Sequence, residues 1–172
     1  MSVRLKAAFT GLLTTPLIMA ADLEVSVEIP RVNVAEYHRP YVAMWIERPD
    51  QTVAANLAVW YDQQTGKAEK GSTWLKDLRQ WWRKSGRDLT MPVDGVSGAT
   101  RPPGVHPIVF RGAKGPLSKL ESGSYHLVVE ASREVGGREL LRLPFQWPSK
   151  SAQPSQAQGR HELGQVQLTV KP

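Results

Sequence analysis

The chain of 172 residues contains no cysteine. This absence excludes disulfides, thiolate nucleophiles, iron–sulfur clusters and cysteine-ligated zinc. Histidine is also scarce: four residues are dispersed at positions 38, 106, 126 and 161 without metal-ligand spacing, so no metal site is expected. The motifs supply no nucleophile–base–acid constellation, which leaves a hydrolase with little support.

Blocks of one charge sign and long apolar runs are missing too. The 22 basic and 16 acidic side chains give a net charge of +6, which falls to +4 without Arg4 and Lys6. Because the positive charges are scattered, they do not indicate a nucleic-acid partner. After residue 20 no apolar run is long enough to span a membrane. A chain of this length suits one globular domain.

The first twenty residues have the pattern of a secretory signal peptide. A basic start precedes an apolar run from Ala7 and small residues at Ala20 and Ala21, where cleavage is expected. An uncleaved anchor is the alternative, but the run is short and interrupted. With no cysteine at the boundary, a lipoprotein anchor is excluded. We expect residues 1–20 to be a signal peptide and residues 21–172 a single periplasmic domain.

The remaining chain is predicted to be rich in β-structure. Leu23–Ile29 alternates strictly between apolar and polar residues, which is typical of a half-buried strand. Further strands are predicted over Tyr41–Glu47, Ala55–Tyr61, Gly123–Ala131, Arg138–Phe145 and Gly164–Val170, with hairpin turns at residues 48–51 and 134–137. Pro92–Pro107 and the Ser-, Gln- and Pro-rich stretch Pro148–Arg160 are expected to be loops.

One helix is predicted over Thr73–Ser85. Ser72 is its expected N-cap and Gly86 its expected end. Five apolar side chains recur on one face of this helix: Trp74, Leu75, Leu78, Trp81 and Trp82. Short, closely spaced strands with one inserted α-helix favour a mainly β, immunoglobulin-like β-sandwich.

A heptapeptide, Asp94-Gly-Val-Ser-Gly-Ala-Thr100, carries most of the functional information. Clusters of Asp, Gly and Ser are typical of any surface loop, and most such loops have no chemical role. The pattern D-x-x-S-G-A-T nevertheless resembles the flavinylated loop in subunits of sodium-pumping NADH:quinone oxidoreductases and their electron-transport relatives. That resemblance implies FMN attached by a phosphoester to the hydroxyl of Thr100, with Asp94, Ser97, Gly98 and Ala99 as the surrounding motif.

The residue types suit that modification. A threonine hydroxyl is a weak nucleophile, so an external flavin transferase that brings Mg²⁺ and FAD has to activate it. Such an enzyme must take in the loop, and the small Gly98 and Ala99 permit this. Asp94 would be read by the transferase. Pro102 and Pro103 stiffen the following segment.

A wider resemblance runs from about Leu23 to the C-terminus. The matched features are AVWYD at 58–62, LRQWW at 78–82, the heptapeptide, EASRE at 130–134, and Gly136-Gly137 leading to LPF at 143–145. With these features the chain resembles a family of predicted periplasmic proteins of unknown function associated with flavin transferases and PepSY-type membrane proteins. The resemblance implies a flavin transferase and a PepSY-type membrane redox protein as partners.

Aromatic and basic side chains near the heptapeptide are candidate flavin contacts. The aromatic candidates are Trp60, Tyr61, Trp74, Trp81 and Trp82, which either stack on a tethered ring or fill the core. His106 is a candidate hydrogen-bond partner or proton shuttle. Arg101 either pairs with the phosphodiester or is an ordinary surface arginine. The chain has no Gly-rich phosphate loop, which fits a covalent tether.

Two functions follow from these observations. The first is an electron carrier with covalent FMN on Thr100 that exchanges electrons with a membrane partner and catalyses no reaction of its own. The alternative is a cofactor-free immunoglobulin-like binding or scaffold module of the cell envelope. Sandwich folds host both kinds of function, so the fold class does not decide between them.

Overall fold

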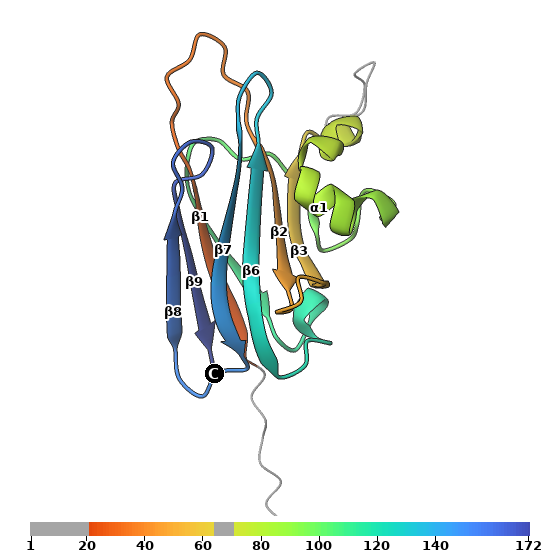
Figure 1. Ribbon diagram of the computed structural model, residues 1–172, viewed down its shortest axis with the longest axis vertical. Helices are drawn as coiled ribbons and strands as arrows, with labels where there is room; N and C mark the ends of the chain where they lie inside the picture. Colours follow the sequence, from red (N-terminus) through yellow and green to blue (C-terminus); the bar gives the residue numbers. More distant parts are fainter. Residues whose placement is uncertain (1–20, 64–70) are drawn as a thin grey trace, which may run out of the picture.

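The computed structural model describes residues 21–63 and 71–172, and the expected signal peptide lies outside these ranges. In these two ranges, nine strands form two sheets (Figure 1). The four-stranded sheet has the order β5 (Gly104–Arg111), β1 (Asp22–Ile29), β9 (Gln165–Lys171), β8 (Gln153–Gln158). The five-stranded sheet has the order β4 (Ser97–Ala99), β3 (Val53–Tyr61), β2 (Tyr41–Glu47), β6 (Gly123–Ser132), β7 (Arg138–Trp147). The mainly β class is therefore confirmed, while the immunoglobulin-like relationship stays a prediction.

The main hydrophobic core lies between the two sheets. Leu23, Val25, Val27 and Ile29 of β1 all point into it, as the alternating sequence predicted. Strands β2 and β6 of the opposite sheet contribute apolar side chains to the same core. The pairing of β2 with β3 and of β6 with β7 confirms both predicted hairpins. Apolar side chains removed from water on both inner faces hold the sheets together.

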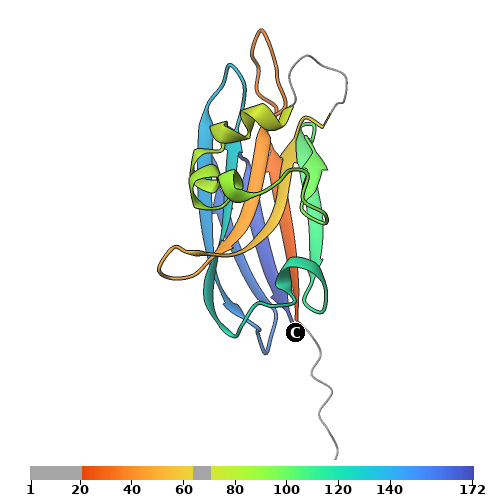
Figure 2. The same ribbon diagram turned by 90° about the vertical axis from the view of Figure 1, so that its right-hand side faces the viewer.

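A second, smaller core covers the outer face of the five-stranded sheet. A helical segment lies across this face (Figure 2) and consists of the 3₁₀ helix η1 (Gly71–Asp77), the helix α1 (Arg79–Lys84) and the 3₁₀ helix η2 (Gly86–Asp88). Leu75, Leu78 and Trp81 are fully buried beneath it, against apolar side chains of β2, β3 and β6.

The prediction of one continuous helix over Thr73–Ser85 is wrong. The chain departs from helical geometry at Leu78, with φ −75° and ψ 69°. Ser72 lies inside η1 and does not cap α1. The fully buried positions Leu75, Leu78 and Trp81 lie three residues apart, one in η1, one at the break and one in α1. Trp74 is exposed, although the helical pattern placed it on the buried face.

Tertiary contacts with two buried glutamates determine where α1 lies. The Glu130 carboxylate of β6 accepts hydrogen bonds from the backbone N–H groups of Gln80 (3.1 Å) and Trp81 (2.9 Å), which would otherwise have no partner at the start of a helix. At the other end, Lys84 forms an ion pair of 3.1 Å with Glu47 of β2. Between them, Trp81 Nε1 donates to Asn56 Oδ1 at 2.8 Å.

The buried Glu130 should make stability fall as the pH rises. Burial raises the pKa of Glu130 above its ordinary 4.5, although the Trp81 and Gln80 N–H groups oppose this. The folded chain then binds this proton more tightly than the unfolded chain, so the free energy of unfolding declines from about pH 4.5 up to the folded pKa. We expect Glu130→Gln to lack this decline in urea titrations between pH 4.5 and 7.5.

Three other carboxyl groups have lowered pKa values, and they change the stability of the fold only at pH values below the range of this titration. The pKa values of Asp22, Asp50 and Glu139 are lowered by hydrogen bonds, so their stabilisation is lost only as the pH falls below their ordinary values. A decline of equal size in wild type and Glu130→Gln would show that Glu130 is not its cause.

Both segments predicted as loops contain strands. Pro148–Arg160 includes β8, an edge strand whose polar side chains alternate between half-buried and exposed and which pairs only with β9. Polar residues and proline are common on edge strands, so the composition of Pro148–Arg160 wrongly indicated a loop. Pro92–Pro107 includes β4 and the first residues of β5. Their pairing comes from strands distant in sequence, which the local turn residues do not reveal.

Candidate functional site

The heptapeptide begins with a tight turn over residues 93–97. The Ser97 backbone N–H donates to the Val93 carbonyl at 2.9 Å, and the Val93 N–H donates to Ser97 Oγ at 2.9 Å. Gly95 has φ +68°, which favours glycine. Asp94 is exposed at this turn. Ser97 and Gly95 therefore have structural reasons for their positions, independent of any modification.

After the turn the chain forms β4, a three-residue edge strand parallel to β3. Its register pairs Trp60 with Gly98 and Tyr61 with Ala99, and the Thr100 N–H donates to the Tyr61 carbonyl at 3.2 Å. A Cβ atom at Gly98 would lie 3.2 Å from Trp60 Cδ1, so a larger residue would crowd the indole. Ala99 is exposed and Thr100 is half-buried. The motif lies at the accessible edge of the sheet.

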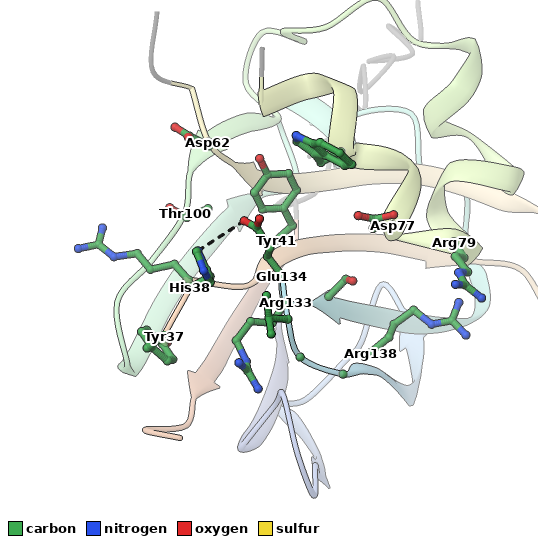
Figure 3. Close-up of a pocket in the computed structure, with 16 residues that line it drawn as sticks. Tyr37, His38, Tyr41, Asp62, Asp77, Arg79, Thr100, Arg133, Glu134 and Arg138 are labelled. Carbon is green, nitrogen blue, oxygen red and sulfur yellow. Dashed lines mark ion pairs between the residues drawn. The ribbon is translucent and has the colours of Figure 1, made fainter. Parts of the chain in front are cut away.

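Thr100 lines a cleft of about 890 Å³ at the end of the five-stranded sheet. The cleft is formed by the loop that precedes β2, the ends of β3 and β6, the β6–β7 turn and η1 (Figure 3). Its functional side chains are basic (Arg39, Arg79, Arg133, Arg138), aromatic (Tyr37, Tyr41, Trp74), acidic (Asp62, Asp77, Glu134) and His38. Arg79 and Arg138 extend together to the side of the cleft away from Thr100 and Asp62.

A buried ion pair supports the wall of the cleft. Arg133 Nε donates to Glu162 Oε2 at 2.8 Å and Arg133 Nη2 donates to Glu162 Oε1 at 3.1 Å. The two side chains are only 6% and 5% exposed. The Gly137 N–H also donates to Glu162, at 2.7 Å. Gly136 packs so closely on Arg133 that a Cβ atom there would lie 2.5 Å from its Cζ, which explains glycine at this turn position.

Other polar contacts connect the loops around the cleft. His38, from the loop before β2, lies 2.9 Å from Glu36 and 3.4 Å from Glu134 of the β6–β7 turn. The Tyr41 hydroxyl donates to the Gly71 carbonyl at 3.1 Å and connects β2 to η1. Burial raises the pKa of Tyr41, so its hydroxyl remains protonated at neutral pH.

Three predicted site residues, Trp60, Arg101 and His106, form a separate cluster. The Arg101 guanidinium lies 5.3 Å from the centre of the Trp60 ring, and the His106 ring packs edge-on against Trp60 at 5.8 Å. His106 Nε2 also lies 2.8 Å from the Pro102 carbonyl oxygen. Trp60 is buried in the main core and none of the three lines the cleft. The structure thus brings them together, but not with Thr100 in the cleft.

Three of the four remaining aromatic candidates belong to the smaller core. Tyr61 packs edge-on against Tyr41 at 6.3 Å, and Trp81 lies 6.4 Å from Trp82. Tyr61 and Trp81 are buried, Trp82 is half-buried, and none of these three lines the cleft. Trp74, by contrast, lines the cleft and is 45% exposed.

The sequence interpretation missed Tyr41, Arg79 and Arg138 as site residues. Each lies in or beside an element that was predicted for structural reasons. No local motif distinguishes Tyr41 or Arg138, and Arg79 belongs to the LRQWW feature, which assigned it no role. They reach one cleft because β2, α1 and β7 begin at the same end of the five-stranded sheet. Among the described residues, no group of three or more His, Asp or Glu side chains is placed to hold a metal ion.

Fold and site together define a two-sheet β protein with a polar and aromatic cleft at one end of a sheet. Residues 22–165 match the family described as "predicted periplasmic protein (DUF2271)", and the chain belongs to it. No curated protein and no solved structure is significantly similar to the chain.

The family description confirms the expected periplasmic location. None of the described helices has the length and hydropathy needed to cross a membrane.

Proposed function

We propose that this protein is a periplasmic electron-transfer flavoprotein that carries FMN on Thr100 through a phosphoester bond. The observation that carries the proposal is the place of Thr100: the threonine of a D-x-x-S-G-A-T sequence lies at an accessible sheet edge and also lines a large cleft. A flavin attached at this residue would have both an entry route for the modifying enzyme and a place to bind. A cofactor-free scaffold remains the alternative.

The residues of the cleft fit this group. Its volume lies within the roughly 300–1,000 Å³ typical of cofactor sites. Trp74 and Tyr41 offer aromatic surface for the isoalloxazine ring, and the cleft arginines offer donors for a phosphate oxygen. When bound, FMN supplies the reversible uptake and release of electrons. The chain's own role is to hold the ring, orient it and limit its contact with water.

Attachment requires that a flavin transferase reach the Thr100 hydroxyl. In the proposed step, Thr100 Oγ attacks the FMN-side phosphorus of FAD, the bridging P–O bond breaks, AMP leaves, and the hydroxyl proton passes to a base of the transferase. Strand β4 makes only three residue pairs with β3 and has its other edge unpaired. Detaching it therefore disrupts few hydrogen bonds, which supports modification of the folded chain.

Co-expression with a flavin transferase tests the proposal directly. We expect flavin fluorescence that survives denaturing electrophoresis and a mass gain of one FMN less one water. The labelled chain should then be reduced or oxidised by vesicles that contain a PepSY-type membrane redox protein, which can be followed by flavin absorbance. A chain that stays colourless beside a competent transferase would favour the scaffold function.

Trp74 is the side chain on which we expect the attached ring to stack. An indole in contact with the isoalloxazine ring quenches its fluorescence by electron transfer to the excited ring, so Trp74→Ala should increase flavin fluorescence per attached FMN. Mass spectrometry should show unchanged attachment. Trp82→Ala is the matched control, because Trp82 lies on the same helical segment but does not line the cleft. Equal increases in both variants would contradict stacking on Trp74.

A further inference from the structure

Two buried polar atoms at the cleft lack hydrogen-bond partners. In residues 21–63 and 71–172, the buried side-chain atoms without one are Tyr37 Oη and Arg133 Nη1. Both residues line the same cleft, although they come from different elements, the loop before β2 and the β6–β7 turn. An unsatisfied buried donor costs about 1–3 kcal/mol, so native structures rarely keep one without a reason.

The two atoms can both donate to the same kind of partner. Arginine has only donors, and the other nitrogens of Arg133, Nε and Nη2, already donate to Glu162. Burial raises the pKa of Tyr37, so its hydroxyl carries a proton at neutral pH and can also donate. A group with two acceptor oxygens would satisfy both atoms at once.

Arginines contribute to the electrostatics at this end of the cleft. Arg31, Arg39 and Arg133 all act on the Tyr37 hydroxyl, together with the Glu162 carboxylate. That carboxylate already accepts three hydrogen bonds, from Arg133 and the Gly137 N–H. The nearby Glu134 carboxylate lies 3.4 Å from His38 and is mostly exposed. The guanidinium groups beside Tyr37 therefore supply positive charge to an oxyanion bound there, although the Glu36 and Glu134 carboxylates lie beside His38 at the same end.

We propose that the end of the cleft between Tyr37 and Arg133 binds an oxyanion, a phosphate or carboxylate group whose oxygens accept hydrogen bonds from Tyr37 Oη and Arg133 Nη1. Both donor atoms are buried, so binding requires Tyr37 to move aside, and Tyr37 belongs to a mostly exposed loop between β1 and β2. Arg133 is held in place by Glu162 and provides the fixed half of the site. The oxyanion is either the phosphoester of a flavin on Thr100 or a separate anion. The site itself does not depend on flavin attachment.

Calorimetric titration of the unmodified chain with inorganic phosphate, at constant ionic strength in chloride, tests this site. We expect saturable binding that Tyr37→Phe weakens by about tenfold or more, since one hydrogen bond to a charged group is lost. The variant should fold normally because it removes only an unpartnered hydroxyl. Tyr125→Phe is the matched control: its hydroxyl donates to the Glu121 carbonyl at 3.0 Å, and Tyr125 does not line the cleft. It should bind phosphate as wild type does.

Absence of saturable phosphate binding, or equal affinity of wild type and Tyr37→Phe, would overturn the proposal. The same titration on the chain carrying FMN distinguishes the two sources of the oxyanion. Loss of phosphate binding after flavinylation would assign the site to the flavin phosphoester, and unchanged binding would assign it to a separate anion. Because the first titration uses unmodified protein, failure of flavin attachment and failure of the oxyanion site give different results.

Discussion

Thr100→Ala should abolish covalent flavin and leave the fold intact. The substitution removes the only atom through which the proposed phosphoester can form at this position. Thr100 is half-buried after a short edge strand, where such changes usually alter stability by only a few tenths of a kcal/mol. In-gel fluorescence and intact mass would measure attachment, and circular dichroism with thermal unfolding would measure the fold. Undiminished covalent flavin in this variant would place the cofactor elsewhere.

Two further variants separate the acceptor from its recognition. Thr100→Ser keeps the hydroxyl and loses one methyl group, so it should retain part of the labelling. Asp94→Ala removes an exposed carboxylate at the turn, where it is available to another protein. We expect reduced labelling with unchanged stability, because the transferase and not the fold uses Asp94. Normal labelling of Asp94→Ala would remove Asp94 from the recognised motif.

Glu162→Gln should have the largest effect on stability. It leaves the Arg133 guanidinium buried without its carboxylate, and breaking such a pair by removing one partner costs about 3–5 kcal/mol. For a chain of this size that loss corresponds to a fall of roughly 6–20 °C in Tm. Urea unfolding and differential scanning calorimetry would measure it.

An exposed ion pair provides the control for this variant. Glu24 lies 2.7 Å from Lys171, but the two side chains are 40% and 51% exposed. Glu24→Gln makes the same chemical change in solvent, where it should cost less than about 1 kcal/mol. Equal destabilisation by both substitutions would show that burial of the Arg133–Glu162 pair is not what stabilises this end of the molecule.

Two strands could be read closely from the sequence. Alternation over Leu23–Ile29 predicted β1 to within one residue, and Tyr41–Glu47 coincides with β2. β2 is buried on both faces and was predicted from its run of aromatic and β-branched residues. β1 obeys a local rule, because one of its faces meets the main core and burial must alternate along it. The strand β8 did not follow that rule, since an edge strand of polar residues resembles a loop in composition.

The helical segment shows the limit of local periodicity. Its apolar residues fit an α-helix, yet the chain forms η1 and then α1, with Leu78 outside helical geometry. The Glu130 carboxylate satisfies the first N–H groups of α1, and Glu130 belongs to a strand some fifty residues later. A helix start defined by a distant buried carboxylate is not visible in a window of neighbouring residues.

The sequence by itself determined the mainly β class, the motif that ends at Thr100 and the periodic core of the strands. Only the tertiary structure decided that Thr100 shares a cleft with Tyr37, Arg133, Arg138 and Trp74, and that Trp81 lies buried elsewhere. Local patterns report which side of an element faces the core, because burial recurs with the period of that element. They do not report which ends of distant elements meet, because that depends on strand order and on pairings between residues far apart in the chain.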